Sequence, residues 1–526
     1  MKILILNLTR FGDLIQTQPV ISGFAAAGCR VGLLCLDNFS SAAALLRGVE
    51  WVAAFPGSRL LAALDRDWRE AVHGFADIRR EVADVFGPDL IVNLTPSLPA
   101  RLLARSLALD LGPGSVRGFG VDEHGFNADT SSWSAFLQLA SGNRGASPFN
   151  VVDLFRRAAG LRHEDASPDL RLPGSDTEDE ESGLLAEAEA LLSEALPDGA
   201  ELSGWLGVQL GASEERRRWP VSRFVEAARL FALQEGLVPV LLGTEAEAAL
   251  GQRFLAEYDG PAVNLMGRTS LPLLGAVLTR LDLLLTNDTG TMHLAAGLGT
   301  PVAAVFLATA QPFDTGPYRE GSLCFEPDLD CHPCAFGAAC PNDHRCRWAV
   351  RAEAVHGFVA GTATGEARDN AGTRAWRSVR GADGLMDFVS LSGHASCDRT
   401  RWIALQRRYY RRLFDGEPLE GVEEAHGLSP ERAERLRGIL GEARELLFLL
   451  ERQAEVLAAH PMQAMKNKFL ATWQRLRGVL EADPDLEVVG LLWGFESQAQ
   501  GDRLDSIVAL AGRYRSLMEA LLRALQ

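Results

Sequence analysis

Short apolar segments alternate with helical segments along the first two thirds of the chain, and this alternation restricts the fold it can adopt. In the first half, the apolar segments carry hydrophobic side chains on both faces, as strands do in a parallel sheet covered by helices. They span residues 2–7, 31–36, 89–94 and 116–119. Stretches rich in Ala and Leu lie between them, such as Ser41–Arg47 and Pro99–Ala108, and these are typical of helices. The pattern predicts a doubly wound α/β domain.

The same pattern returns after an acidic, turn-rich segment, Pro173–Glu181. An acidic helix is expected over Leu184–Leu196, and a helix without this acidic character is expected over Arg223–Gln234. Strands are expected at residues 206–210, 238–242, 263–266, 281–285 and 302–306. The fold class is therefore α/β, with two Rossmann-like domains facing a cleft. Ligands bind such sheets at the carboxyl ends of the strands.

The pattern changes after about residue 350. Ala360–Gly384 is rich in Gly, Ala, Thr and Arg and is expected to be a loop, and helices are expected over 428–458, 462–482 and 501–525. We therefore divide the 526 residues into three parts, since domains usually hold ~100–200 residues each. These are a Rossmann-like domain at 1–172, a second one at 173–355, and a linker with a mostly helical C-terminal region at 356–526.

Composition excludes some classes of partner. The net charge of −17 argues against nucleic acid, because binding to phosphates needs a basic surface. No apolar run reaches the ~18–20 residues that span a bilayer. Met1–Leu8 is interpreted as a buried strand and not as a signal peptide, because Arg10 and Asp13 follow without a small-residue cleavage site. We expect a cytoplasmic protein.

The sharpest motif is Asn287-Asp288-Thr289-Gly290-Thr291-Met292-His293-Leu294-Ala295-Ala296, directly after an expected strand. Asp288 and Thr289 are good N-cap residues, and Gly290 allows a ligand to approach the backbone. The start of the helix then offers free N–H groups and a partial positive charge, which suit a diphosphate, and His293 is in reach of the same anion. The alternative is an ordinary capped helix.

Several ordered motifs over residues 1–350 together resemble glycosyltransferase family 9, the heptosyltransferases. The motif above is similar to the family's Asp-(Thr/Ser)-Gly-x-x-His-Leu-Ala-Ala. The others are Arg10-Phe11-Gly12-Asp13-Leu14-Ile15 with Gln18-Pro19, Gly211-Ala212-Ser213 with Arg217-Arg218-Trp219-Pro220, Gly243-Thr244-Glu245-Ala246-Glu247, and Met266-Gly267-Arg268-Thr269-Ser270-Leu271. The resemblance implies a GT-B fold, with an acceptor domain first and a nucleotide-sugar domain second. It also implies an inverting transfer that needs no catalytic metal.

The resemblance also implies roles for individual residues. Asp13 matches the proposed general base, although it could simply cap a helix. Arg217 matches a phosphate-binding Lys, and Arg218 replaces it if the alignment slips by one; the alternative for both is a solvated basic run.

The remaining candidate residues are donor contacts. Ser213 is expected to contact phosphate. Glu247 is expected to contact the nucleotide, although an acid at a helix start is favoured by the dipole anyway. The resemblance makes four further residues contacts of the sugar and diphosphate: Asp288, Thr289, Gly290 and His293.

Five of the eight cysteines lie in residues 324–346. Four of them have the spacing Cys331-x₂-Cys334-x₅-Cys340-x₅-Cys346, which predicts a tetrahedral, structural site for iron or zinc. Disulfides are the alternative, and Cys324, His332 or His344 could replace a ligand. Autotransporter heptosyltransferases are similar in carrying a cysteine-bound iron, which makes iron plausible.

Six arginines and four aromatic residues gather in Arg399–Phe414. This segment could contact phosphorylated lipid at the inner membrane, but packing within an acidic protein is favoured. We predict transfer of a sugar, heptose by resemblance, from an ADP-sugar to a hydroxyl of lipopolysaccharide or of a surface protein. A non-catalytic nucleotide-sugar-binding scaffold is the second hypothesis, and a nucleotide-sugar epimerase is a weaker third. The added tail leaves room for homo-oligomer formation.

Overall fold

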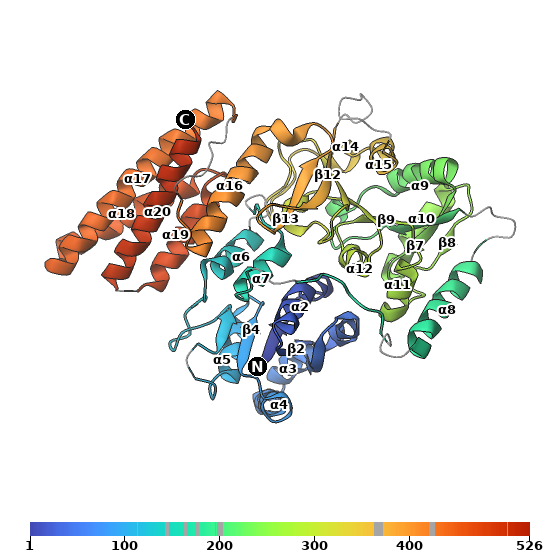
Figure 1. The fold of residues 1–526 in the computed structure, drawn as a ribbon, viewed down its shortest axis with the longest axis horizontal. Coiled ribbons are helices and arrows are strands. Elements are labelled where there is room, and N and C mark those ends of the chain that lie inside the picture. Colours follow the sequence, from blue (N-terminus) through green and yellow to red (C-terminus); the bar gives the residue numbers. More distant parts are fainter. Residues whose placement is uncertain are drawn as a thin grey trace. The chain divides into compact units, whose positions relative to one another are not determined.

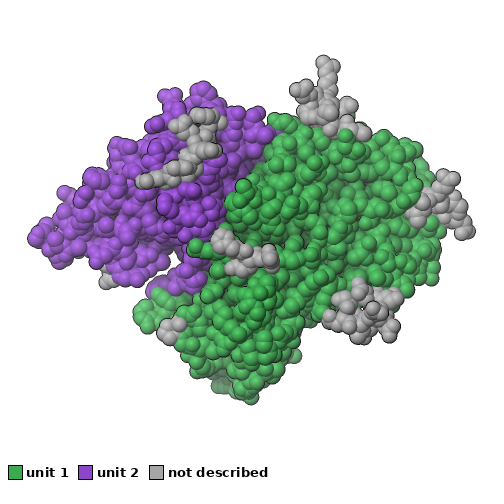
Figure 2. Space-filling model, in the orientation of Figure 1, with its two compact units in different colours: residues 1–125, 150–393 green, residues 126–149, 394–526 purple. Residues whose placement is uncertain are grey.

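The structure is a computed structural model, and it describes residues 1–112, 114–142, 147–162, 166–173, 178–194, 196, 203–361, 372–419, 427–501 and 503–526. The chain forms two compact units (Figure 2). Unit 1 contains residues 1–125 and 150–393, and unit 2 contains residues 126–149 and 394–526. Both expected Rossmann-like sheets lie in unit 1.

The first sheet has five parallel strands in the order β3-β2-β1-β4-β5. Its strands are β1 (Lys2–Asn7), β2 (Arg30–Leu36), β3 (Val49–Phe55), β4 (Leu90–Asn93) and β5 (Val116–Gly118). The central strand β1 is apolar on both faces because it is covered on both, and Ile3, Leu4, Ile5 and Leu6 have no exposed surface. This confirms the strands expected at 2–7, 31–36, 89–94 and 116–119.

Helices connect these strands. They are α1 (Phe11–Ile15), α2 (Gln18–Ala26), α3 (Gly57–Leu64), α4 (Trp68–Glu81), α5 (Leu98–Leu107), the 3₁₀ helix η1 (Asp37–Leu45) and the π-helix η2 (Val82–Phe86). The helix α7 (Val151–Ala158) follows in the same unit. The helix expected over Ser41–Arg47 is thus the second half of a 3₁₀ helix, and Arg47 lies outside it.

The second sheet has eight strands in the order β13-β12-β11-β10-β9-β6-β7-β8. Figure 1 labels β13, β12, β9, β7 and β8 of this sheet. Six are parallel: β6 (Gly204–Gln209), β7 (Leu237–Leu242), β8 (Val263–Asn264), β9 (Leu283–Asn287), β10 (Val302–Val305) and β11 (Leu323–Pro327). In both sheets the strand order reverses beside the first strand, which is the doubly wound topology. Two such domains in one unit make the GT-B fold.

The helices of this half are α8 (Glu178–Glu194), α9 (Val221–Glu235), α10 (Ala248–Glu257), α11 (Leu271–Leu278), α12 (Gly290–Leu298), α13 (Pro312–Thr315), α14 (Cys346–Ala349) and α15 (Ala352–Val359). The 3₁₀ turns η4 (Glu215–Arg217) and η5 (Glu245–Glu247) join them. The helix expected at Leu184 begins earlier, at Glu178, within the segment that was interpreted as a linker. Residues 174–177 of that segment lie outside the described residues.

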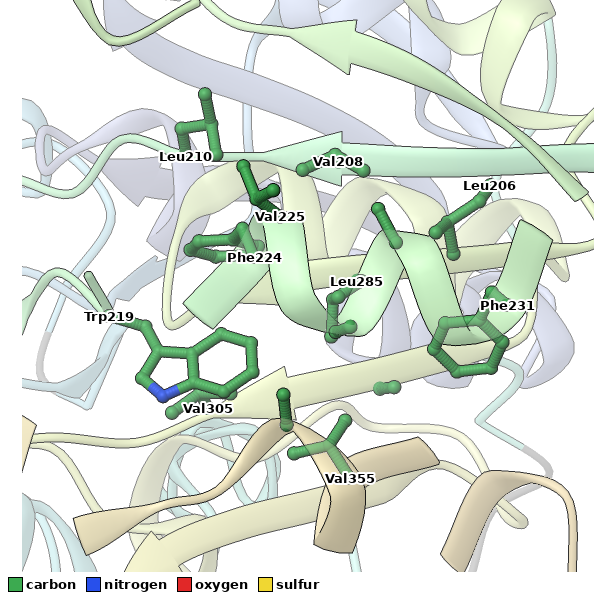
Figure 3. Close-up of a cluster of buried hydrophobic side chains, with 14 of the residues drawn as sticks. Leu206, Val208, Leu210, Trp219, Phe224, Val225, Phe231, Leu285, Val305 and Val355 are labelled. Carbon is green, nitrogen blue, oxygen red and sulfur yellow. The ribbon is translucent and has the colours of Figure 1, made fainter. Parts of the chain in front are cut away.

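The core of this half is packed between α9, the sheet and α15 (Figure 3). Phe224 and Phe231 lie on α9 at a spacing of seven residues, so both face the sheet. Trp219 anchors the start of α9: its ring meets Phe224 edge-on, and its Nε1 donates to the carbonyl of Val350 at 3.0 Å. This core fixes the loop between β6 and α9, where the candidate site residues Ser213, Arg217 and Arg218 lie.

The structure differs from the expectation for residues 360–384. The strands β12 (Thr373–Arg380) and β13 (Met386–Ser390) extend the second sheet in antiparallel fashion beyond β11. The loop prediction is wrong for Thr373–Arg380, because pairing with β11 overrides a polar, Arg-rich sequence. Residues 362–371 of the predicted loop are not among those described. The second sheet therefore continues past residue 355, the domain boundary predicted from the sequence.

Unit 2 is helical. It contains α6 (Ser132–Gly142), α16 (Asp398–Asp415), α17 (Pro430–Ala459), α18 (Gln463–Glu481), α19 (Glu487–Ala499), α20 (Leu504–Ala524) and the turn η7 (His394–Ser396). The three helices expected from periodicity in the tail are confirmed as α17, α18 and α20, and α19 was not expected. No helix in the described part of the chain is both long and apolar enough to cross a bilayer.

The basic and aromatic segment 399–414 forms most of α16. Its aromatic side chains are buried, with Tyr410 and Phe414 packed against Phe136 of α6. Among its arginines, Arg411 pairs with Asp415 and Glu417 at 3.5 and 3.1 Å. The helix therefore uses its aromatic side chains within unit 2, which favours the packing alternative over contact with a membrane.

Candidate functional site

The central candidate lies at the carboxyl ends of β6 and β9, which are neighbours in the second sheet. Asp288 and Thr289 follow β9, and α12 begins at Gly290. Thr289 occupies the N-cap position with extended backbone angles, but its side chain makes no capping hydrogen bond to a described residue. The first N–H groups of α12 therefore have no side-chain cap from Thr289 and suit an anionic ligand.

A basic side chain lies beside this helix start. Arg217, in η4 after β6, donates through Nη2 to Oδ2 of Asp288 and through Nη1 to Oγ of Ser213, the latter at 3.2 Å. The side chains of Arg217 and Asp288 are only 11% and 8% exposed, so water screens this pair weakly. The structure thus brings three candidate residues from two strand ends into one polar cluster.

Arg218 lies elsewhere. Its Nε donates to the carbonyl of Ala212 at 3.1 Å, and its own carbonyl accepts from Nε of Arg347 at 3.0 Å. Between the two arginines left open by the sequence, Arg217 is the one that contacts Asp288.

Sequence reasoning missed Asn287, which holds this cluster together. Its side chain has no exposed surface. Its Nδ2 donates to the carbonyls of Leu210 and Gly211 at 3.0 Å each, and its Oδ1 accepts from the N–H of Trp219 at 2.8 Å. It therefore ties the end of β9 to the loop after β6. The sequence feature that could have indicated Asn287 is a polar residue at the end of an apolar strand, immediately before Asp288.

Glu247 packs against the same loop. Its Oε2 accepts from the N–H and Oγ1 of Thr244 at 2.9 and 3.1 Å, which makes the capping box of η5. A Cβ atom at Gly211 would lie 1.6 Å from Oε1 of Glu247, so the carboxylate occupies space that only glycine leaves open. Glu247 is thus both a helix-capping residue, as the alternative proposed, and a neighbour of the Gly211 loop.

The loop after β1 meets α12. Asp13 lies half-buried in α1, and its carbonyl accepts from Nδ2 of Asn7 and Oγ1 of Thr17 at 3.2 and 3.0 Å. A Cβ atom at Gly12 would lie 3.4 Å from both Cα of Gly290 and Cδ2 of His293. The glycine loop of the first sheet and the helix start of the second are therefore in contact within unit 1.

A small cavity of about 20 Å³ lies behind this contact, lined by Gln16, His293 and Tyr318 among others. It is large enough for about one water molecule. Nε2 of Gln16 is buried and has no hydrogen-bond partner among the described residues. Burial raises the pKa of Tyr318 well above its usual value, and the neighbouring Asp153 carboxylate raises it further, so its hydroxyl stays protonated.

The four cysteines of the loop 331–346 are free thiols. Burial raises the pKa of Cys334, and the neighbouring thiols of Cys346, Cys331 and Cys340 raise it further. Among the described residues, however, no group of three or more His, Cys, Asp or Glu side chains is already arranged to hold a metal ion.

Two alternative ligands have other contacts. His332 is buried, and its Nε2 lies 3.1 Å from Oε2 of Glu326, whose Oε1 accepts from Nε1 of Trp376 at 3.1 Å. Cys324 is fully buried in β11, and burial raises the pKa of its thiol well above the usual value. His332 therefore anchors the base of the loop to the sheet, and Cys324 packs as a small apolar residue.

The comparisons agree with this fold. Residues 150–344 match the model of glycosyltransferase family 9 (heptosyltransferase). Lipooligosaccharide heptosyltransferase 2 of Campylobacter jejuni is 29% identical over 155 residues, which make up 28% of this chain and 48% of that protein. Lipopolysaccharide heptosyltransferase 2 of Escherichia coli is 31% identical over 101 residues, or 18% of this chain and 29% of the relative. The chain thus spans about half or less of the length of these relatives.

A solved structure described as the glycosyl transferase family 9 from Veillonella parvula aligns with a TM-score of 0.54 and 17% identity. It covers 69% of this chain and 96% of the solved one, and at this identity it shows the fold alone. The fold defines the chain as a GT-B protein. The match of residues 150–344 to the family 9 model covers four of the five motifs that suggested the resemblance.

Proposed function

We propose that the protein is an inverting glycosyltransferase that passes a sugar from a nucleotide-sugar to an acceptor hydroxyl. The cluster of Arg217, Ser213 and Asp288 beside the start of α12 carries this proposal. It combines a guanidinium, a hydroxyl and helix N–H groups, which are the groups that bind a diphosphate. The contact of Gly12 with Gly290 supports the acceptor side of the proposal, because it brings the loop that carries Asp13 to the start of α12.

The chemistry needs stabilisation of a departing anion. When the bond between the sugar and the diphosphate breaks, negative charge grows on the diphosphate, and donors already in place stabilise it most. Arg217 holds Asp288 in the structure, so we propose that its guanidinium turns to the diphosphate when donor binds. Asp288 then accepts hydrogen bonds from the sugar hydroxyls.

The acceptor hydroxyl must lose its proton as it attacks. We propose Asp13 as the general base that takes this proton. The backbone of Asp13 is held by Asn7 and Thr17, so α1 presents the residue on a fixed turn. No catalytic metal enters this proposal.

Donor and acceptor follow from the family resemblance. Two relatives that match part of the chain are named as heptosyltransferases of lipooligosaccharide or lipopolysaccharide, which supports heptose as the sugar. We propose an ADP-activated heptose as donor and a hydroxyl of lipopolysaccharide or of a surface protein as acceptor. A cytoplasmic site of action, at the inner membrane or away from it, belongs to the same proposal.

The test is a transfer assay on the full chain with ADP-heptose and each acceptor class in separate arms. Asp13→Asn should abolish transfer and leave ADP affinity unchanged, because the base acts on the acceptor. Asp77→Asn is the matched control, since Asp77 is exposed and pairs with Arg80 on α4. ADP binding without transfer to any acceptor would favour the scaffold hypothesis, and absence of ADP binding would refute both.

We propose separately that the four cysteines hold a structural iron or zinc. Four thiols are a donor set that both metals accept, and a bound ion would crosslink the loop without an open position for substrate. Elemental analysis of the purified chain should find about one metal per chain. Cys340→Ser should lose it, whereas Cys397→Ser, outside the loop, should not. If removal of the metal from the wild-type protein leaves its thermal unfolding midpoint unchanged, the proposal of a structural metal is contradicted.

A further inference from the structure

Three consecutive arginines, Arg216, Arg217 and Arg218, lie in the loop between β6 and α9, and the middle one contacts Asp288. A shift of this loop by one residue would bring a different arginine to the start of α12. Within the 3₁₀ turn η4, the N–H groups of Arg217 and Arg218 each donate to the carbonyl three residues earlier at 3.0 Å. A 3₁₀ turn is short and its hydrogen-bond geometry is poor, so other contacts must fix its position.

The loop of the four cysteines, residues 331–346, contacts η4 through the arginine that precedes Arg217. Nη1 of Arg216 donates to the carbonyl of Ala338, in the middle of this loop, at 3.0 Å. Nε of the same side chain donates to Oε2 of Glu214 at 2.7 Å. The side chain of Arg216 is only 19% exposed. Its guanidinium therefore joins the turn to the cysteine loop.

The segment directly after the last cysteine contacts the residues on the other side of Arg217. Arg347 of α14 donates through Nε to the carbonyl of Arg218 at 3.0 Å and through Nη1 to Oε1 of Glu215 at 3.2 Å. Nε1 of Trp219 donates to the carbonyl of Val350 at 3.0 Å. These hydrogen bonds hold the end of η4 and the start of α9 against α14. Contacts with the cysteine loop and with α14 therefore hold the turn on both sides of Arg217.

The cysteine loop can support η4 because both of its ends are attached to the second sheet. Near its beginning, the N–H of Cys334 donates to the carbonyl of Ala308, which follows β10, at 2.8 Å. The buried His332 pairs with a carboxylate of β11, as described above. Beyond its end, the N–H of Arg351 donates to Oγ1 of Thr373 on β12 at 3.2 Å. The position of η4 is thus tied to three strands of the sheet through this loop.

We propose that the cysteine loop, residues 331–346, positions Arg217 for the nucleotide-sugar, with Arg216 and Arg347 as the positioning residues. This inference rests on the proposed function of the Arg217 cluster as the donor site. The guanidinium groups of Arg216 and Arg347 are both engaged with carbonyl and carboxylate oxygens, so they hold the turn while Arg217 faces Asp288. Loosening of the cysteine loop therefore lowers the affinity for the donor, although no cysteine contacts the donor in this proposal.

The first test is hydrogen exchange, measured by mass spectrometry on the full chain without ligand. Arg347→Met keeps the length of the side chain but removes both of its hydrogen bonds. The N–H groups of Arg217 and Arg218 should then exchange about tenfold faster, because the turn opens more often. Arg347→Lys keeps a charged donor and should restore part of the protection. Arg351→Met is the matched control, since that side chain pairs with Glu353 of α15 at 3.5 Å, and it should exchange like wild type.

The second test is calorimetric ADP binding to the same variants and to Arg216→Met. Arg216→Met and Arg347→Met should each weaken ADP about tenfold, Arg347→Lys should weaken it less, and Arg351→Met should leave it unchanged. The thermal unfolding midpoint of each variant checks folding, and Arg216→Met carries both tests if Arg347→Met does not fold.

Two results overturn the proposal: exchange in η4 that stays at the wild-type rate in Arg216→Met and Arg347→Met, or faster exchange with unchanged ADP affinity. Wild-type protein that binds no ADP refutes the proposed function instead. The exchange experiment needs no ligand, so it still decides whether the cysteine loop holds η4, and the two failures are distinguishable.

Discussion

Gly211→Ala is the substitution whose effect follows most directly from the geometry. The new Cβ atom would lie 1.6 Å from Oε1 and 2.4 Å from Cδ of Glu247, so the carboxylate must move. The backbone of Gly211 does not lie in the left-handed region, so alanine would cause a steric clash there but no backbone strain. Displacement breaks the hydrogen bonds from Thr244 that cap η5, which costs about 0.5–2 kcal/mol of stability. If Glu247 also contacts the nucleotide, a charged hydrogen bond of ~1.5–3 kcal/mol is lost. ADP affinity should then fall about 10- to 150-fold.

The assay is calorimetric ADP binding to wild type, Gly211→Ala, Glu247→Ala and the double variant. Because both substitutions act through the same carboxylate, the double variant should bind no more weakly than Glu247→Ala. Gly438→Ala is the matched control, since a Cβ atom there meets no other atom within 4 Å. Additive losses in the double variant, or unchanged affinity in Gly211→Ala, would refute the reasoning.

Three further predictions concern packing, contact between the two loops, and pH. Phe224→Ala should cost ~3–5 kcal/mol in urea unfolding because the side chain is fully buried, whereas Leu233→Ala on the same helix, 83% exposed, should stay within about 0.5 kcal/mol. Gly290→Ala should slow transfer at least about tenfold, because its Cβ atom would lie 2.4 Å from the ring of Phe11, and adding Phe11→Leu should recover part of the rate; no recovery would count against this contact. Burial raises the pKa of Tyr514 well above 10, so above pH 10 the unfolded state releases a proton that the folded state keeps, and stability should fall by up to ~1.4 kcal/mol per pH unit. Denaturant unfolding between pH 8 and 11 should show a smaller slope for Tyr514→Phe, and an identical slope would contradict the assignment.

The sequence alone indicated two doubly wound α/β domains, because strands buried on both faces leave continuous apolar runs that alternate with helical segments. This held for β1, β2 and β4, and for β6, β7, β9 and β10. It failed for β3, which is half exposed, and for β12, which carries three arginines; both are strands because a neighbouring strand offers hydrogen bonds. Local pattern records burial, whereas edge pairing is a property of the assembled sheet.

The candidate site divides in the same way. The motif Asp288–His293 could be placed at a helix start from its sequence, because a strand end, N-cap residues and a glycine are local signals. Only the tertiary structure decided that Arg217 rather than Arg218 contacts Asp288, that Asn287 ties two loops together, and that His332 pairs with Glu326. These contacts join residues from different strand ends, and their partners are set by sheet order and side-chain packing, which no local stretch of sequence contains.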